Sequence, residues 1–382
     1  MRKIKILLVG ADGYATAYVD ELLNRCPKDV QLVGIVEKYL NNCSKYNEII
    51  ESGIPTFETM EDFFKWHSAD LAIISTPPFL HCEQSLTAIK NGANVLVEKP
   101  LTTNVEEATI MAEYERRYNK FIAVGYQWSF SNAIQELKKD IFTGLLGNPI
   151  SMKTVICWPR SIDYFNRGSG WGGKLHYNGK LILDSIASNA CAHYIHNMLF
   201  LLGDSMQSSI QAKIIDAQCL RANNIESFDT CTIHAIAKNN TELFFAASHA
   251  TEVCKNPQFE YKFSDATVYY SQDDPNCSTI KAVFNDGSQK DYGNPFENDM
   301  KKLYDCINAI HNKTVPICTA KTAIRHTEFI VDLFNSTTIK NFNKNKIKYD
   351  KQTNSIYVEA LYDEIIKCYE DCTLLSKQKF MM

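Results

Sequence analysis

The residues best suited to take part in a reaction are Glu98-Lys99-Pro100. They follow an apolar run that begins at Val95. This run predicts a buried strand that ends in a carboxylate, an ammonium group and a proline. Ligands of open parallel sheets bind outside the carboxyl ends of the strands, so charged side chains there are placed for chemistry. A lysine on a rigid strand can reach a substrate, and burial can tune its pKa. The structural alternative is a solvated strand end with an ordinary Glu–Lys pair.

A second group lies within residues 183–203, where the pattern predicts a helix from about Asn189 to a cap at Gly203. In that helix Asn189, His193 and His196 are spaced i, i+4 and i+7 and share one face. An imidazole titrates near neutral pH, so His193 can accept a proton from a hydroxyl group. Asn189 can hydrogen-bond a substrate hydroxyl, but it cannot share charge with an imidazolium.

Two histidines on one helix face also fit a metal site. No third ligand stands at a fixed spacing from them in the sequence, and we predict no metal. A buried histidine is more often a core residue that makes two hydrogen bonds. This is our interpretation of His196.

The composition is that of an ordinary globular protein. A chain of 382 residues is too long for one small core, so two domains are expected. A formal net charge of -4 provides no basic field for nucleic acid and no polybasic patch for a membrane. The 13 cysteines are scattered without a C-x-x-C pair, and the apolar N-terminal segment is too short for a signal peptide. These features predict reduced thiols in the cytoplasm.

Up to residue 125 the sequence alternates between strand and helix patterns. Such alternation predicts βαβ units and a parallel sheet, hence an α/β fold. Six strands are expected, at residues 3–9, 30–36, 54–57, 70–75, 95–97 and 121–125. We therefore predict a doubly wound, dinucleotide-binding Rossmann domain over residues 1–127 and a second domain over residues 128–382.

The turn after the first strand is the expected place for cofactor phosphates. The fingerprint G-x-G-x-x-G is represented by Gly10, Asp12 and Ala15, with Gly13 and Tyr14 in the same loop. Alanine is allowed at the third position, but Asp12 is a departure at the second. A carboxylate that pointed inward from there would repel a pyrophosphate.

Glu37 closes the second strand at about the distance expected for the ribose-binding carboxylate. Such a carboxylate accepts hydrogen bonds from an adenine ribose and disfavours a 2′-phosphate. We therefore predict NAD as the cofactor. Lys38 could contact a phosphate instead, so NADP stays open.

Several motifs occur in the order found in one known family. They are the Gly10/Gly13 loop, Ser75-Thr76-Pro77-Pro78 followed by His81, Glu98-Lys99-Pro100-Leu101, and Val124-Gly125-Tyr126-Gln127. With these motifs the chain resembles the glucose–fructose oxidoreductase and inositol dehydrogenase (Gfo/Idh/MocA) family. The resemblance implies a Rossmann domain followed by an α+β domain with a large, mainly antiparallel sheet that covers the nicotinamide. It also implies a homodimer or homotetramer through that sheet.

The resemblance implies roles for individual residues. Lys99 would touch both the nicotinamide ribose and a substrate hydroxyl. The other residues expected near the cofactor are Glu98, Ser75, Thr76, Pro77, His81, Gln127 and Trp128.

In the family's catalytic helix the resemblance aligns His193 with the family histidine. Asn189 and His196 then replace the two aspartates that usually accompany it. Asp184 can supply the missing carboxylate only if the turn before the helix folds back.

A polar-aromatic segment follows the strand expected from residue 151. It contains Trp158, Arg160, Tyr164 and Trp171, residue types that suit a sugar-like ligand when loops are held on a scaffold. An ordinary long loop over the core is the alternative. Further on, the pairs 233–237 with 243–247 and 259–263 with 266–270 alternate like antiparallel strands.

The leading hypothesis is an NAD(P)-dependent oxidoreductase that acts on a carbohydrate or polyol hydroxyl. His193 would accept the hydroxyl proton, and Lys99 would orient and polarise the oxygen. One rival is an enzyme that recycles a tightly bound NAD during glycoside cleavage. Another is a non-catalytic module that senses dinucleotide or sugar, suggested by Asp12 and by the loss of both helix carboxylates.

Overall fold

The computed structural model describes residues 2–167 and 169–380, which form two compact units. Unit 1 contains the chain up to Phe130 together with Asn298–Ile324. Unit 2 contains Ser131–Glu297 and the chain from Arg325 onward. The division expected at residues 127 and 128 leaves out the returning segment of unit 1.

Unit 1 is built on a six-stranded parallel sheet in the order β3-β2-β1-β4-β5-β6. The strands are β1 (Ile4–Val9), β2 (Val30–Val36), β3 (Thr56–Phe57), β4 (Leu71–Ile74), β5 (Asn94–Val97) and β6 (Ile122–Val124). The strand order reverses between β1 and β4, which is the switch point of a doubly wound sheet. The predicted Rossmann topology is confirmed.

Helices alternate with these strands, as the apolar periodicity predicts. They are α1 (Ala15–Asn24), η1 (Leu40–Asn42), α2 (Tyr46–Glu51), α3 (Met60–Phe64), η2 (Pro78–Leu80), α4 (His81–Lys90), α5 (Val105–Tyr118) and α6 (Gln127–Phe130). Local capping decides where α5 begins, because Asn104 Oδ1 accepts hydrogen bonds from the N–H groups of Glu106 and Glu107 (2.8 and 3.2 Å).

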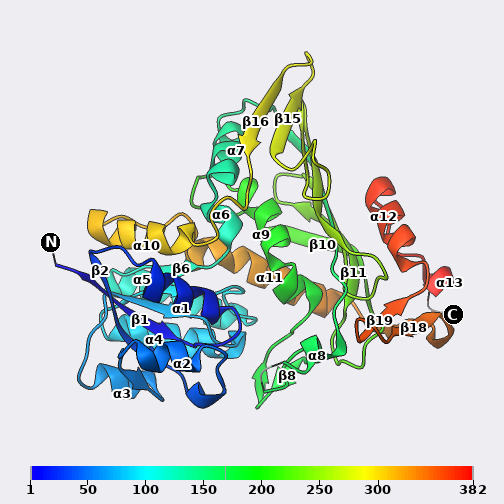
Figure 1. Ribbon diagram of the computed structural model, residues 1–382. Helices are drawn as coiled ribbons and strands as arrows, with labels where there is room; N and C mark the ends of the chain where they lie inside the picture. The colour runs from blue at the N-terminus through cyan, green and yellow to red at the C-terminus, as the bar shows by residue number, and fades with distance from the viewer. Residues whose placement is uncertain (1, 168, 381–382) are drawn as a thin grey trace. The chain divides into compact units, whose positions relative to one another are not determined.

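The returning segment completes unit 1. Its helix α10 (Lys301–Asn312) lies beside the N-terminal elements in Figure 1, although it comes late in the chain. Beyond α10, the Val124 N–H donates to the Cys318 carbonyl (3.0 Å), and Ala123 forms a bridge with Thr319. This pairing satisfies the open edge of β6, which would otherwise expose unpaired backbone groups.

Unit 2 contains a nine-stranded sheet in the order β16-β15-β14-β13-β7-β12-β11-β10-β17. The neighbours β12–β7 and β10–β17 are parallel and the other pairs are antiparallel, so the predicted mainly antiparallel sheet is confirmed. The strands are β7 (Pro149–Cys157), β10 (Ala212–Arg221), β11 (Thr230–Ala237), β12 (Glu242–Ser248), β13 (Lys255–Phe263), β14 (Ala266–Ser271), β15 (Ile280–Phe284), β16 (Gln289–Gly293) and β17 (Ile339–Asn341).

Alternation along β7 gives the centre of this sheet two buried faces. Val155 belongs to an apolar cluster with Leu361 and Ile365 of α12 (Leu361–Asp371). Thr154 points to the other face, where its hydroxyl bonds the Tyr261 hydroxyl (3.2 Å). Asn197 of α9 (Ala192–Leu201) donates to the same Tyr261 oxygen (3.4 Å), so helices cover both faces there.

The remaining elements of unit 2 are short or peripheral. They are α7 (Asn132–Phe142), α8 (Ile162–Phe165), the hairpin β8 (His176–Tyr177) and β9 (Lys180–Leu181), η3 (Ile186–Ala190), η4 (Lys344–Lys346), the hairpin β18 (Ile347–Asp350) and β19 (Ser355–Val358), and α13 (Lys377–Phe380). Helix α11 (Ala320–Ser336) contributes residues to both units.

Two findings concern the state of the cysteines and the length of the helices. All 13 cysteines are free thiols. Within residues 2–167 and 169–380, the helices are all too short or too polar to cross a membrane. The homo-oligomer through the large sheet and the cytoplasmic location stay predictions.

The close approach of two loops at the switch point generates a first prediction, on Gly10. Its φ is +91°, and a Cβ atom there would lie 2.5 Å from the Ser75 carbonyl oxygen. Gly13 also has a positive φ, +61°, but a Cβ atom there would meet nothing within 4 Å. Gly10→Ala should therefore lower the free energy of unfolding by about 3 kcal/mol, against about 1 kcal/mol for Gly13→Ala. Urea unfolding of both variants measures this, and equal losses would show that the clash is relieved.

Candidate functional site

The carboxyl edge of the Rossmann sheet gathers most of the residues predicted near a cofactor. The loops that leave β1, β2, β4, β5 and β6 all open at this edge because the strands are parallel. They carry Gly10, Glu37, Thr76, Lys99 and Gln127, respectively. Residues up to about 117 positions apart in the sequence are thus brought to one edge by the pairing of the strands.

The loop after β1 is organised by the carboxylate that ends β2. Glu37 Oε2 accepts a hydrogen bond from the Ala11 N–H (3.0 Å), and Oε1 accepts one from the Tyr39 N–H (2.9 Å). Each oxygen keeps a lone pair for a further donor, such as a ribose hydroxyl. Lys38, next to Glu37, is exposed and lies over the Tyr39 ring, 5.5 Å from its centroid.

Asp12, the departure from the glycine fingerprint, has a partner of its own. Its Oδ1 accepts a hydrogen bond from the Ser44 hydroxyl (3.2 Å), which directs the carboxylate toward the segment between η1 and α2. Helix α1 starts without a side-chain cap, and Gly13 leaves open space above the loop. A helix start without a side-chain cap, next to open space, fits the phosphates of a dinucleotide, because the helix dipole favours negative charge there.

His81 ties two of the loops together. Its Nδ1 lies 2.8 Å from the Pro100 carbonyl, and its Nε2 lies 2.8 Å from the Thr76 carbonyl. The side chain is fully buried, and burial lowers its pKa against the effect of the two carbonyls. His81 therefore holds the loop after β4 against the loop after β5. Ser75 and Pro77 are half-buried in the first of these loops.

Glu98 is the centre of a buried charged cluster. Its Oε1 accepts hydrogen bonds from the Lys302 ammonium (2.5 Å) and from the Tyr18 hydroxyl (2.7 Å). The Lys302 side chain is 0% exposed, and its Nζ also donates to the Tyr14 hydroxyl (3.0 Å). Burial opposes the charge of Lys302, but Glu98 and Tyr14 outweigh it, so the Lys302 pKa is raised. Glu98 and Tyr14, both expected near the cofactor, are thus bound by Lys302.

Lys302 was not predicted from the sequence. It lies on α10, about 200 positions after Glu98, and no local pattern links the two. The one available signal is its place within an amphipathic helix, at a position that is buried rather than exposed.

The remaining predicted residues of this edge differ in accessibility. Lys99 is half-buried directly after Glu98, and the Lys99–Pro100 peptide is cis. Gln127 is half-buried and donates from Nε2 to Asp299 Oδ1 (3.2 Å). Trp128 is only 1% exposed, so its indole packs into the core of unit 1, and its place near the nicotinamide stays a prediction.

In unit 2 the predicted catalytic helix is divided, so the expectation of one continuous helix from Asn189 is wrong. A single π-helical turn, η3, ends at Ala190, and α9 starts anew at Ala192. The turn η3 has its own start, because Ser185 and Ser188 form a capping box there. Asn189 thus lies in η3, and His193 lies in the first turn of α9.

His193 has a distinctive place on α9. It is half-buried, whereas the other nine residues of that helix are buried. His196 is among them, 1% exposed and stacked on Phe200, so it is a core residue. His193 is thus the position of α9 from which an imidazole can meet a ligand.

Asp184 does fold back onto Asn189. Asn189 Nδ2 donates to Asp184 Oδ1 (2.8 Å), and the Gly173 N–H donates to Oδ2 (2.7 Å). Arg167 completes the set with an ion pair to Oδ2 (3.2 Å). The carboxylate orients the Asn189 amide and neutralises Arg167 at once.

The predicted polar-aromatic residues form one cluster. The Tyr164 ring lies against two guanidinium groups, Arg160 at 4.9 Å and Arg167 at 4.0 Å from its centroid. Arg167 also lies over Trp171 (4.4 Å), and Arg160 lies over Trp158 (5.6 Å). These residues are organised by contacts and do not form a loose loop over the core.

His249, at the end of β12, is a member of this cluster that sequence reasoning missed. Its Nδ1 lies 2.7 Å from the Trp158 carbonyl, and its ring packs edge-on to Tyr164 at 5.6 Å. Burial, followed by the positive charge of Arg160, lowers the His249 pKa to about 3. The imidazole is therefore neutral and donates its Nδ1 proton to the carbonyl.

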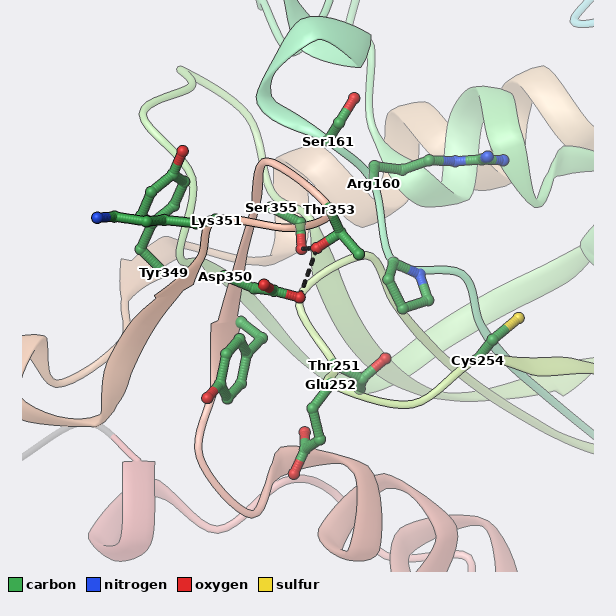
Figure 2. Close-up of a pocket in the computed structure, with 12 residues that line it drawn as sticks. Arg160, Ser161, Thr251, Glu252, Cys254, Tyr349, Asp350, Lys351, Thr353 and Ser355 are labelled. Atoms are coloured by element: carbon green, nitrogen blue, oxygen red, sulfur yellow. Dashed lines mark hydrogen bonds between the residues drawn. The ribbon is translucent and has the colours of Figure 1, made fainter.

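A cavity of about 530 Å³ adjoins the cluster (Figure 2). The β7–α8 segment, the β12–β13 loop and the β18–β19 hairpin line it, with Ser161, Thr251, Thr353 and Ser355 as hydroxyl groups. Thr353 donates to Asp350 Oδ2 (2.8 Å) and bonds the Ser355 hydroxyl (2.7 Å), the dashed lines of Figure 2. Much of this polar lining is thus already paired within the hairpin.

Comparison with known proteins finds a family model that matches the N-terminal part of the chain. Residues 4–126 match the family model GFO_IDH_MocA, described as an oxidoreductase family with an NAD-binding Rossmann fold. Residues 4–126 thus carry the NAD-binding Rossmann domain of the Gfo/Idh/MocA family. The resemblance inferred from the motifs is thereby confirmed.

Curated relatives match this chain over limited lengths. Glucose-6-phosphate 3-dehydrogenase of Bacillus subtilis is 29% identical over 149 residues, 39% of this chain and 41% of the relative. The scyllo-inositol 2-dehydrogenase (NAD(+)) of the same species is 33% identical over 97 residues, 25% of this chain and 27% of the relative. The chain thus matches less than half the length of these relatives.

Solved structures share the fold over most of the chain. The WlbA dehydrogenase of Chromobacterium violaceum, in complex with NADH and UDP-GlcNAcA, aligns with a TM-score of 0.71. The alignment covers 88% of this chain and 94% of that one at 18% identity. At this identity the likeness establishes the two-part fold alone.

The Glu98–Lys302 pair generates a prediction on stability. Lys302→Met should lower the free energy of unfolding by about 3–5 kcal/mol, because it leaves the Glu98 carboxylate buried and unpaired. Glu98→Met combined with Lys302→Met should lose less than the sum of the two single changes. Urea unfolding of the four proteins measures the coupling.

Lys301→Met is the matched control for this series. Lys301 pairs with Asp305 in an i, i+4 arrangement in which both side chains keep about a quarter of their exposure (23% and 26%). Its loss should cost less than about 1 kcal/mol. Equal losses for the two lysine variants would contradict the buried role of Lys302.

The His249 environment generates a prediction on pH. The folded-state pKa of about 3 lies below the ordinary histidine value of 6.5, so folding excludes the proton. The stability this contributes is present above pH 6.5 and is lost as the pH falls toward 3. The stability advantage of the wild type over His249→Gln should therefore shrink by about 2 kcal/mol between pH 7.5 and pH 5. Unfolding of both proteins at the two pH values measures it, with His176→Gln in the exposed β8–β9 hairpin as control. An advantage that stays constant with pH would refute the neutral buried state of His249.

Proposed function

We propose that this protein is an NAD-dependent oxidoreductase that transfers a hydride between a hydroxyl-bearing carbon of a carbohydrate or polyol and nicotinamide. The observation that carries the proposal is the edge of the Rossmann sheet, where the glycine loop, Glu37 and Lys99 follow three strands of one sheet. The names of the relatives that act on glucose 6-phosphate and scyllo-inositol support the substrate class.

The choice of NAD over NADP rests on Glu37. Its carboxylate is fixed by the N–H groups of Ala11 and Tyr39 and keeps lone pairs for the hydroxyls of an adenine ribose. A 2′-phosphate at that place would meet a negative charge. Lys38 is exposed beside it and provides the route by which NADP could still bind.

The residues of the chain have distinct roles in this proposal. The bound nicotinamide supplies or accepts the hydride. Lys99 donates a hydrogen bond to the substrate oxygen and polarises it, and His193 accepts the hydroxyl proton. Asn189, oriented by Asp184, hydrogen-bonds a neighbouring sugar hydroxyl. His81 and Lys302 position the two loops from which the cofactor contacts come.

The test uses the purified chain with NAD and with NADP against a panel of sugars, sugar phosphates, sugar acids and inositols. Formation of NADH at 340 nm is expected with at least one member. Lys99→Ala and His193→Gln should each lower kcat/KM by about 100-fold or more, as removal of a polarising or proton-accepting group does. Lys3→Ala is the matched control, because Lys3 is exposed at the opposite, amino-terminal edge of the same sheet.

Cofactor binding, followed by calorimetry, separates the outcomes. No absorbance change in either direction with either cofactor, while NAD binding is measured, would overturn the dehydrogenase proposal. Turnover of glycosides without net NADH would favour recycling of a retained NAD. Nucleotide found by mass spectrometry of the denatured protein would support that reading.

A further inference from the structure

Arg160 is a cation without a counterion in a cluster where the other guanidinium is neutralised. Arg160 and Arg167 lie against the same Tyr164 ring. Arg167 pairs with Asp184, whose side chain is 6% exposed. Among residues 2–167 and 169–380, Arg160 makes no ion pair, and its buried Nε has no hydrogen-bond partner. A desolvated donor without a partner is costly, so the arrangement favours an acceptor from outside the chain.

The groups around Arg160 do not supply that acceptor. His249 is neutral and directs its Nδ1 proton at the Trp158 carbonyl. The carboxylate of Asp350 is engaged with Thr353 and with the Gln352 N–H. In Figure 2 the Arg160 guanidinium points away from both Asp350 and Glu252. Within residues 2–167 and 169–380, no carboxylate is therefore paired with Arg160.

A series of ring contacts connects Arg160 with His193. Its guanidinium lies over Trp158, whose ring packs edge-on to Tyr194 at 5.8 Å. Tyr194 follows His193, and their rings are 6.4 Å apart. Arg160 is half-buried and lines the cavity beside the cluster.

We propose that Arg160 binds an anionic substituent, a carboxylate or a phosphate ester, on the sugar or polyol substrate. The inference rests on the proposed function and narrows its substrate class. A guanidinium fork matches both kinds of oxyanion with two parallel hydrogen bonds, which an ammonium group cannot reproduce. The bound anion also neutralises the second of two like charges that flank Tyr164.

The test compares neutral and anionic forms of the same rings. The probes are glucose with glucuronate and glucose 6-phosphate, and galactose with galacturonate and galactose 6-phosphate. Binding is measured by calorimetry on the full chain saturated with NAD, and turnover is followed at 340 nm. At least one anionic probe should bind about tenfold more tightly than its neutral partner or more. Carboxylate and phosphate arms show which of the two oxyanions is preferred.

Substitutions assign the preference to Arg160. Arg160→Gln should abolish the preference for the anionic probe, because it raises the Kd and KM of that probe about tenfold or more. The loss should be smaller for the neutral probe, and for the anionic probe it should appear in KM more than in kcat, as for the loss of a contact made equally in ground and transition states. Arg160→Lys should recover only part of it, because the fork is lost. Lys262→Gln removes an equal charge at an exposed site on β13 and should retain the preference.

The outcomes separate this inference from the proposed function. Turnover of neutral and anionic probes with equal KM overturns the role of Arg160 and leaves the oxidoreductase intact. A preference that survives Arg160→Gln overturns it as well, as does failure of every probe to bind. Binding that depends on Arg160 without any NADH formation supports anion recognition and counts against the dehydrogenase.

Discussion

The ion pair of Glu98 and Lys302 is a buried constraint on which the arrangement of unit 1 depends. Its ammonium side chain is 0% exposed and its carboxylate side chain 9%, so neither charge can be left alone without a large desolvation cost. Strand β5 and helix α10 must therefore come together for either residue to be stable in place. Gly125 leaves the necessary room, because a Cβ atom there would lie 2.8 Å from Glu98 Oε1. The same pair fixes the backbone from which Lys99 projects.

Unit 2 also contains a buried carboxylate that pairs with a cation, but a second cation beside it is left uncompensated among the described residues. Asp184 neutralises Arg167 and at the same time holds the Asn189 amide, so one buried carboxylate organises both a cation and a polar ligand group. Arg160 receives no such partner, although it contacts the same tyrosine. The contrast between a compensated and an uncompensated guanidinium on one ring supports the proposed role of Arg160 in anion recognition, because structural stability alone would favour pairing both.

Much of unit 1 could be predicted because its signals are local. The apolar runs that form β1, β2, β4 and β5 are bounded by turn residues, and parallel pairing then brings Gly10, Glu37 and Lys99 to one edge. The helix expected from Asn189 failed for a local reason too. The Ser185–Ser188 cap starts a separate π turn, so Asn189 precedes α9 and is not part of it. The burial of Trp128 could not be predicted, because burial depends on packing and not on nearness to a motif.

The sequence by itself determined the alternation of strands and helices, the strand ends that carry Glu37 and Lys99, and the histidine at the start of α9. These follow from periodicity and turn chemistry, which act over a few residues. Only the tertiary structure decided that Lys302 neutralises Glu98, that Asp184 turns back onto Asn189 and that His249 stays neutral beneath Arg160. Those outcomes depend on which charges are buried together, and partners separated by up to about 200 positions meet only when both are desolvated in the folded chain. The tripeptide Glu98-Lys99-Pro100 therefore contains a recognisable lysine. The ion pair that fixes its backbone needs Lys302, which lies on helix α10 about 200 positions later.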